Sequence, residues 1–434
     1  MEPSMHELAI TQSVVETIVE RTECARVTAV HLVIGKVSGV VPGAVRFCFE
    51  IVAAGSPVEG ARGYRSRAWA ERHADGRPLT TVQHHHAHVA SVMAEHGLDG
   101  SRPVVGISFD GTGYGTDGAV WGGEVLAADY AGFHRFAHLR YVPLAGGDAS
   151  VRRPYRMALA HLRAAGVDWD DDLPPVAACP PAELRVLAHQ LATGTGCVPT
   201  SSMGRLFDAV SALLGIRQIV DFEAQAAIEL ECRSRNVPLG DRAYMFAVRD
   251  GGPNVPLVAD PEPVIRAVVA DLRAGVTPAT AGARFHAAVV ALVVALADRA
   301  RRDLDLHDVA LTGGVFQNAL LLGVACRALR AAGFSVLRHQ RVPPGDGGLA
   351  LGQLLVAAGR KEMTLCRRHR RPSPVPVRRV QGHDPSVWVR RVGAHLASLP
   401  PAQTDGQERS STLAWVEPTR VVPHLRAALL RYLG

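Results

Sequence analysis

The chain has 434 residues, 47% of them hydrophobic and only 5% aromatic, so Ala, Val and Leu must fill most of its core. This length fits about two to four domains. The formal charge of +6 is concentrated at one end, because residues 361–434 hold 13 of the 47 basic but only 5 of the 41 acidic residues. The rest of the chain is slightly acidic, which excludes the basic footprint of a nucleic-acid-binding domain.

The seven cysteines are scattered, and no two of them form a C-x-x-C pair. The sequence therefore predicts neither a zinc ribbon nor a disulfide framework, and it fits a reducing cytosol. The longest apolar run, residues 287–297, is far shorter than the roughly 20 residues that cross a bilayer. The N-terminus lacks the basic segment of a signal peptide. We therefore expect a cytoplasmic protein with neither nucleic acid nor a membrane as a partner.

Three segments are predicted along the chain. Residues 1–61 combine helical patterns with a β-branched strand at 27–34, which predicts a small α+β unit. Residues 62–360 mix strand and helix patterns and predict an α/β domain. Residues 361–434 are rich in Arg and Pro and lack sustained periodicity. We expect them to form a largely disordered basic tail with one short helix at 425–433.

The α/β segment contains several predicted elements. Strands are expected at residues 104–109, 119–127 and 309–311. Helical patterns dominate residues 158–214 and 279–302, and further helices should follow Asn318 and Leu349. Thr277 and Pro278 stand ahead of the second helical pattern, as an N-cap and a first helical residue would.

Four histidines lie within five residues, at His84, His85, His86 and His88. On a helix, His84 and His88 are one turn apart and face the same way. Two neutral imidazoles at that spacing can bind one divalent metal. The cluster lacks the Glu of H-E-x-x-H, which excludes a zinc-protease motif. A solvated His-rich helix face is the alternative, and the density of the cluster favours the metal site.

An aspartate follows the strand at 104–109 and opens a glycine-rich turn, DGTGYGTDG, at residues 110–118. A carboxylate at Asp110 would suit a metal beside phosphate, and glycines let backbone N–H groups approach an anion closely. Residues 113–118 spell G-x-G-x-x-G, but this stretch joins two strands and does not open a helix, which excludes a dinucleotide-binding motif. An ordinary glycine hairpin remains the alternative.

Three further loops carry polar groups ahead of a helix. Asp346, in PPGDGG, is a second candidate metal ligand, or else a simple helix cap. The stretch LTGGVFQN at residues 311–318 follows a strand, so its N–H groups would face an anion or a sugar. The stretch TSSMGRLFD at residues 200–208 offers hydroxyls at a helix start, with N-capping as the alternative.

These motifs occur together and in one order along residues 63–360: VQHHHAH, FDGTGYGTDG, TSSMGRLFDAV, AQAAIELE, LTGGVFQN and DGGLALGQ. The set resembles the C-terminal carbamoyl-transfer domain of HypF, a maturation protein of NiFe-hydrogenases. The resemblance implies a carbamoyltransferase with a two-lobed actin/Hsp70-like (ribonuclease-H-like) ATPase fold. In that family the carbamoyl group passes from carbamoyl-adenylate to the C-terminal cysteine of HypE. It then becomes the cyanide ligand of the hydrogenase iron.

The resemblance also implies roles for individual residues. An iron or zinc ion would be held by His84, His88, Asp110 and Asp346. His85 and Asp110 would be the catalytic groups, with His85 close to the carbamoyl carbon. ATP or carbamoyl-adenylate would be bound by the glycine-rich and hydroxyl-bearing loops, at Gly111, Thr112, Gly113, Ser202, Gly204, Arg205, Asp208, Gly313, Gly314 and Asn318.

The first segment resembles a second hydrogenase maturation protein. MHELAI, starting at Met5, and VIGKVSGVVPGAVRFCFE resemble the N-terminal nickel-binding segment of HypA. In that family the His and Glu that follow the initiator Met help to bind nickel, so His6 and Glu7 inherit this role. The resemblance implies HypB and other hydrogenase maturation factors as further partners.

Both resemblances are partial. We expect no counterpart of the acylphosphatase, zinc-finger and adenylating domains that precede the transfer domain in HypF, nor of the zinc domain of HypA. Gly345 and Ala224 stand where the HypF pattern has Asn and Gly. Three functions are therefore considered. They are a carbamoyltransferase that receives adenylate from another chain, a nickel-delivery or scaffold protein, and an inactive fusion.

Overall fold

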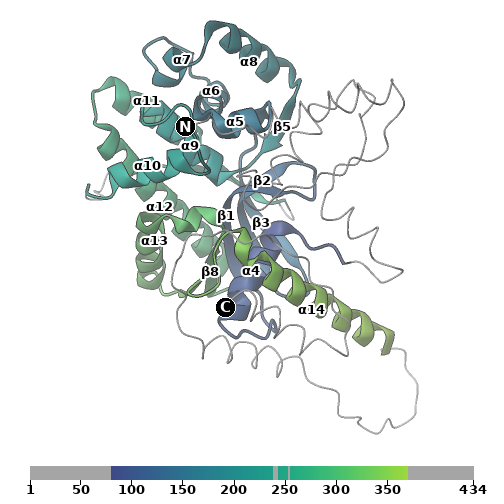
Figure 1. Ribbon diagram of the computed structural model, residues 1–434. Coiled ribbons are helices and arrows are strands. Elements are labelled where there is room, and N and C mark those ends of the chain that lie inside the picture. Colours follow the sequence, from purple (N-terminus) through teal and green to yellow (C-terminus); the bar gives the residue numbers. More distant parts are fainter. Residues whose placement is uncertain (1–79, 238–242, 253–254, 370–434) are drawn as a thin grey trace, which may run out of the picture.

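The computed structural model describes residues 80–237, 243–252 and 255–369, with side chains described as far as residue 359 (Figure 1). The predicted α+β unit at 1–61, with His6 and Glu7, lies outside the described residues. The predicted disordered tail lies outside them beyond residue 369, together with its expected helix at 425–433.

A nine-stranded mixed sheet forms the centre of the described part. Seven strands follow the order β6-β7-β3-β2-β1-β8-β9, while β4 and β5 pair with each other beside β2. β1, β2 and β3 are antiparallel, whereas β8 and β9 run parallel to β1. The strands are β1 Val104–Tyr114, β2 Val120–Ala128, β3 Phe133–Leu139, β4 Val142–Ala145, β5 Cys197–Thr200, β6 Ala247–Arg249, β7 Leu257–Asp260, β8 Asp308–Thr312 and β9 Ser335–Arg338.

Helices cover both faces of this sheet, with α4 and α14 on one side and α12 and α13 on the other (Figure 1). The α/β class predicted from the sequence is therefore confirmed. The helices are α4 His84–Glu95, α5 Asp148–Arg152, α6 Pro154–Ala164, α7 Pro174–Ala178, α8 Pro181–Thr193, α9 Met203–Leu213, α10 Gln225–Ser234, α11 Glu262–Arg273, α12 Pro278–Leu304, α13 Ala319–Ala331 and α14 Leu349–His369. Two 3₁₀ turns, η1 Gly314–Gln317 and η2 Asp346–Gly348, precede α13 and α14.

Alternate residues of β1 face two different apolar clusters, as the period of a strand requires. Val105 joins the large cluster formed with α6, α9 and α12, whereas Val104 joins a smaller cluster formed with α4 and α14. Gly106, on the same face as Val104, lies under Val89 of α4, and a Cβ at this position would overlap that valine. The same alternation directs Asp110 toward α4.

Helix α12 begins as predicted, with Pro278 as its first residue and the Thr277 hydroxyl accepting the N–H of Thr280. Among the described residues, α12 alone is long and apolar enough to cross a membrane. However, 61% of its most apolar stretch is buried inside the protein, as in a core helix.

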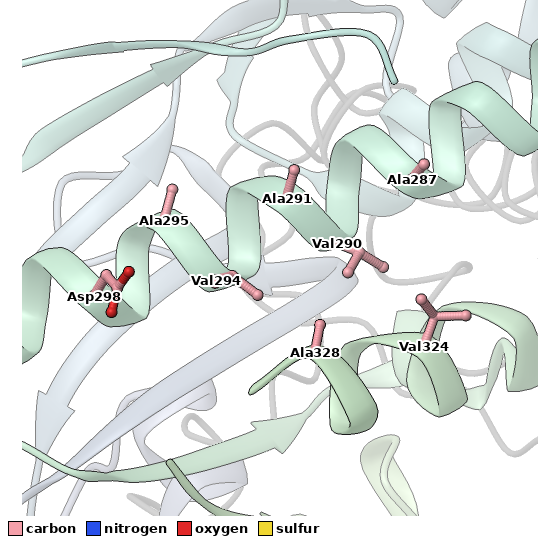
Figure 2. Close-up of a pocket in the computed structure, with 8 residues that line it drawn as sticks. All are labelled: Ala287, Val290, Ala291, Val294, Ala295, Asp298, Val324 and Ala328. Atoms are coloured by element: carbon pink, nitrogen blue, oxygen red, sulfur yellow. The ribbon is translucent and has the colours of Figure 1, made fainter. Parts of the chain in front are cut away.

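An apolar groove of about 550 Å³ lies between α12 and α13 (Figure 2). Its lining residues are Ala287, Val290, Ala291, Val294, Ala295, Asp298, Val324 and Ala328. None of them is a site residue predicted from the sequence, so this groove is separate from the chemistry discussed below.

The sequence prediction for the end of β1 is wrong in one respect. The strand does not end at Phe109 but continues to Tyr114, and the turn to β2 is confined to residues 115–119. The register against β2 shifts between Phe109 and Gly113, so a bulge lies at Asp110. Because β1 and β2 form an antiparallel hairpin, the rejection of a dinucleotide-binding motif is confirmed.

The predicted helical stretch at residues 158–214 is interrupted by β5. Gly194 and Gly196 both have positive φ angles and end α8, after which the chain pairs with β4. A strand of four residues between two helices leaves too short an apolar pattern to be recognised by periodicity.

Two departures from the family pattern have different structural settings. Ala224, where the pattern has Gly, precedes α10 with a φ of 59°, a left-handed conformation that costs an L-residue about 1–2 kcal/mol. The backbone thus explains why glycine suits this position. Gly345, where the pattern has Asn, has a φ of −85° and a ψ of −159°, so its backbone does not require glycine.

Helix α14 packs against α4 at Gly352. A Cβ on this glycine would overlap the carbonyl oxygen of Ala87, which lies between His84 and His88 in α4. Only a residue without a side chain permits this approach. Because Asp346 lies in the turn just before α14, the contact also sets where Asp346 lies relative to the two histidines.

We predict that Gly352→Ala destabilises the protein by about 1–3 kcal/mol, because the added methyl group needs space that the α4 backbone occupies. Urea unfolding of the full chain measures the change. Gly323→Ala in α13 is the matched control, since its Cβ would meet only the end of Arg327, at 3.7 Å. The control should be more stable than the natural chain by about 0.5–1 kcal/mol, because alanine has a higher helix propensity than glycine. Similar effects of the two substitutions would contradict the prediction.

Candidate metal centre

Helix α4 starts with the histidine cluster because Gln83 caps it. The Gln83 side-chain oxygen accepts the backbone N–H of His86 at 2.8 Å. His84 and His88 are then one turn apart, and their Nε2 atoms lie 3.2 Å from each other. His88 is fully buried, and His84 is 18% exposed. The helical placement that the sequence predicts for these two imidazoles is confirmed.

Asp110 reaches the histidines from the bulge in β1. Its Oδ2 lies 3.1 Å from His84 Nε2 and 3.0 Å from His88 Nε2. Its Oδ1 accepts the backbone N–H of Gly111 at 2.8 Å and that of Gly314 at 3.2 Å. The carboxylate therefore links the two histidines to the loop that follows β8.

Asp346 completes the group from η2. Its Oδ1 lies 3.5 Å from His84 Nε2 and 3.8 Å from His88 Nε2, and its side chain is 73% exposed. One ligand atom from each of the four residues lies within 4.8 Å of the others. Donors bound to one cation at about 2.0–2.2 Å are separated by about 3–4 Å. The distances from the two histidines to each other and to both carboxylates, 3.0–3.8 Å, match this separation.

The electrostatics of the group also favour a cation. Burial raises the pKa of Asp110, but hydrogen bonds from His84 and His88 outweigh burial and hold this pKa well below its usual range. Burial lowers the pKa of His84, but its hydrogen bond to Asp110 and the charge of Asp110 outweigh burial and raise it. Asp110 is therefore an ionised carboxylate between two imidazoles, and this combination of ligands suits zinc or iron.

The His85 ring lies beside the group, with its centre 5.1 Å from that of the His84 ring, and it is completely buried. The Gln83 amide is oriented by the cap, so its Nε2 donates to His85 Nδ1 at 3.1 Å. Burial, and then the charge of His84, lower the pKa of His85 well below its usual value, so the ring is neutral. Its proton must then lie on Nε2, which is buried and has no hydrogen-bond partner among the described residues. Within this part of the chain, His85 is therefore a hydrogen-bond donor without an acceptor.

Two glycine loops approach the group closely. A Cβ on Gly113 would overlap the rings of His84 and His85. Gly313 has a φ of 94°, and a Cβ there would overlap the backbone of Phe109. Gly111 and Gly314 donate their N–H groups to Asp110. Four of the five glycines predicted to bind a nucleotide thus lie together at the metal group.

The start of α9 lies against the same bulge. Ser202 caps this helix, since its Oγ accepts the N–H of Arg205 and donates to the carbonyl of Gly111 at 2.6 Å. A Cβ on Gly204 would come within 2.9 Å of the Gly111 Cα. The capping role considered for Ser202 in the sequence is thus observed, and a ligand contact by this residue stays a prediction.

Arg205 and Asp208 form a buried ion pair on α9, with Nη2 and Oδ2 3.2 Å apart. Burial raises the pKa of Asp208, and the charge of Arg205 opposes this rise. In the part of the chain that the structure describes, the buried Nε and Nη1 atoms of Arg205 have no hydrogen-bond partner, and its Nη2 would lie 3.5 Å from a Cβ on Gly111. Arg205 therefore has spare donors beside the glycine loop.

The last two predicted nucleotide contacts differ in accessibility. Asn318 is an N-cap, because its Oδ1 accepts the N–H of Leu321 at 2.8 Å, and its amide nitrogen lies 2.9 Å from His286 Nε2. Its side chain is thus occupied by the protein itself. Thr112 is exposed on the glycine loop. Contacts of both residues with a ligand stay predictions.

A buried charged cluster beside His85 was not predicted from the sequence. Glu124 is fully buried and accepts hydrogen bonds from Arg135 Nε at 2.7 Å and Ser201 Oγ at 2.6 Å. The Arg135 guanidinium lies 3.8 Å from the centre of the Trp121 ring, which lies 6.0 Å from the His85 ring. The sequence signal for this cluster was the stretch WGGE, which places a Trp and a Glu within one apolar strand.

Comparisons with known proteins agree with this geometry. The profile for "Carbamoyltransferase, Kae1-like Domain, second subdomain" matches residues 106–353, which is more than half of the chain. The chain belongs to the HypF carbamoyltransferase family. The HypF Kae1-like domain profile matches residues 60–95. The profile for the hydrogenase/urease nickel-incorporation metallochaperone HypA matches residues 5–64.

Individual HypF proteins are similar over the same region. Carbamoyltransferase HypF2 of Cupriavidus necator is 38% identical over 66% of this chain, and HypF of Rhodobacter capsulatus is 42% identical over 66%. The chain spans only 37% and 36% of these relatives. It spans 71% of a HypF homologue from Cupriavidus necator at 37% identity. HypA of Geobacter sulfurreducens is 57% identical over 58 residues, which are 13% of this chain and 53% of HypA.

Solved HypF structures have the same fold. Full-length HypF in its phosphate- and nucleotide-bound form matches with a TM-score of 0.62 and 38% identity, covering 68% of this chain and 45% of HypF. HypF of T. kodakarensis matches with a TM-score of 0.58 and 31% identity, covering 68% and 38%.

We predict that His84→Ala and Asp346→Ala each weaken binding of Zn²⁺ or Fe²⁺ by at least about tenfold, because each removes one donor from the group. Competition with a chromophoric chelator under anaerobic conditions measures the affinity. His96→Ala is the control, since His96 caps the other end of α4 and contacts Arg338. Full metal affinity in both site variants would show that the assignment of ligands is wrong.

Proposed function

We propose that the described domain transfers a carbamoyl group from carbamoyl-adenylate to a thiolate of a partner protein. The observation that carries this proposal is the convergence of His84, His88, Asp110 and Asp346 beside two glycine loops. Membership of the HypF family supports the reaction class. The two-lobed actin/Hsp70-like fold is part of the same proposal.

The donor set suits a resident iron or zinc ion. Two imidazoles and two carboxylates, with no thiolate, are ligands that both metals accept. When bound, the ion would act as a Lewis acid that polarises a phosphate or carbonyl oxygen. The protein's contribution is to hold Asp110 ionised and to keep both Nε2 atoms directed at one point.

The residues around the group have distinct proposed tasks. The glycine loops bring backbone N–H groups close to where phosphate would lie, and Arg205 adds a positive charge beside Gly111. His85 would donate its unpaired Nε2–H to the carbamoyl oxygen as negative charge develops there. The partner thiolate forms the S–C bond, and the C–O bond to phosphate breaks, so that AMP leaves with the electron pair.

The acceptor we propose is the C-terminal cysteine of HypE, whose thiocarbamate is then dehydrated toward the cyanide ligand of the hydrogenase iron. This would make the protein a hydrogenase maturation enzyme of the cytoplasm. Carbamoyl-adenylate is the substrate to supply, because the matched residues 60–353 correspond to the Kae1-like part of HypF. We propose domain divisions at residues 61 and 360, so that residues 62–360 form the domain that transfers the carbamoyl group.

The test is to mix the full chain with carbamoyl-adenylate and HypE and to weigh HypE by mass spectrometry. We expect HypE to gain one carbamoyl group, and a HypE variant without its C-terminal cysteine to gain none. His85→Ala should slow transfer about a hundredfold while the metal content stays unchanged, because one hydrogen bond to the developing charge is lost. His85→Gln, which keeps an N–H donor, should recover part of the rate.

Two results would contradict the proposal. Unmodified HypE, with metal bound and carbamoyl-adenylate intact, would favour an inactive fusion. A His85→Ala variant as fast as the natural chain would remove the donor role of His85 and leave the transfer reaction itself in place.

The match of residues 5–64 to HypA favours nickel delivery as a second function. We predict that Ni²⁺ binding with one ion per chain is lost in His6→Ala and Glu7→Ala, because these residues would supply two of the ligands. Ni²⁺ binding is measured by calorimetry in a His84→Ala background, so that binding at the histidine cluster does not contribute. Unchanged Ni²⁺ affinity in both variants would contradict this second function.

A further inference from the structure

Glu95, the last residue of α4, binds a segment that is distant in the sequence. Its Oε1 lies 2.9 Å from the backbone nitrogen of Gln340, 2.6 Å from that of Arg341 and 3.4 Å from that of Val342. The Glu95 side chain is only 4% exposed. One buried carboxylate thus accepts N–H groups from three consecutive residues, an arrangement that fixes a loop strongly.

The second oxygen of Glu95 extends this contact to the strand that precedes the glycine loop. Glu95 Oε2 lies 3.0 Å from His339 Nδ1, and His339 Nε2 lies 3.0 Å from the hydroxyl of Thr312. A carboxylate only accepts, so Nδ1 must donate to Glu95. With its proton on Nδ1, the neutral ring accepts from Thr312 at Nε2. Thr312 is the last residue of β8, immediately before Gly313.

The segment that Glu95 holds leads directly to Asp346. Beyond Val342 the loop is attached to the site once more, since the Gly313 N–H donates to the carbonyl of Pro344 at 3.0 Å. Asp346 itself is 73% exposed and makes no side-chain cap bond to η2. Its carboxylate therefore depends on the backbone of this loop to remain near the histidines.

We propose that Glu95 is a positioning residue for the metal centre, which ties the loop carrying Asp346 to the helix carrying His84 and His88. This inference rests on the metal site of the proposed function. Glu95 lies at the opposite end of α4 from His84, and its hydrogen bonds go to His339 and to the loop at 340–342, which leads to Asp346. The proposal therefore makes a specific statement: the effect of Glu95 on metal binding passes through Asp346.

A double-mutant cycle tests this statement on the full chain. Glu95→Ala, Asp346→Ala and the double variant are compared by their dissociation constants for Co²⁺, measured by competition with a chelator. The visible spectrum of bound Co²⁺ reports the ligand geometry. We expect Glu95→Ala to weaken binding about tenfold and to change the spectrum in the direction of Asp346→Ala. In the Asp346→Ala background, Glu95→Ala should have no further effect.

Two further variants separate positioning from general stability. Glu95→Gln keeps one oxygen for the backbone N–H groups, so it should lose less Co²⁺ affinity than Glu95→Ala. It replaces Glu95→Ala in the cycle if Glu95→Ala does not fold. Glu183→Ala is the matched control. Glu183 is also a largely buried carboxylate and accepts from Tyr155 and Arg153, away from the metal group. It should lower the unfolding midpoint and leave Co²⁺ affinity unchanged.

The possible outcomes distinguish a failure of this inference from a failure of the proposed function on which it rests. Additive losses from Glu95→Ala and Asp346→Ala would overturn positioning through Asp346. A normal affinity in Glu95→Ala, with weakened binding in Asp346→Ala, would overturn the role of Glu95 and leave the metal site standing. A normal affinity in Asp346→Ala would overturn the metal site itself.

Discussion

The close packing of α4 against β1 on one side and α14 on the other is the constraint on which the site depends. Gly106 lets the helix lie close to the sheet, and Gly352 lets α14 touch the α4 backbone. Since β1 carries Asp110 and the turn before α14 carries Asp346, both contacts bring carboxylates to the histidines of α4. Larger residues at either glycine would move a whole element, and the donor atoms would separate with it.

The sequence predicted the site as far as local spacing and family pattern allow. The pairing of His84 and His88 follows from the helical period alone, which is why it needed no other part of the chain. The approach of Asp346 to the same point follows from sheet order and helix packing, and only the family pattern indicated it. The extension of β1 through Asp110 was missed, because a bulge has no period that a sequence window can detect.

Side chains that bind the backbone were the hardest to predict. Capping was an alternative in the sequence for Ser202 but was not considered for Asn318, and the structure uses both as caps. Gln83 and Glu95 also bind main-chain N–H groups, at the two ends of α4. Gln83 lies in the VQHHHAH motif without a predicted role of its own, and Glu95 lies outside the quoted motifs. Every residue type except proline supplies a main-chain N–H, so the sequence does not reveal which partner such a side chain binds.

The four donors of the metal group differ sharply in their access to water. His88 and Asp110 are buried and His84 is nearly so, whereas most of the Asp346 side chain is in solvent. An ion would therefore enter and leave on the Asp346 side, where the group meets solvent. Such a layout would make the open corner the place where the ion exchanges with solvent, while all four donors contribute to how tightly it is retained.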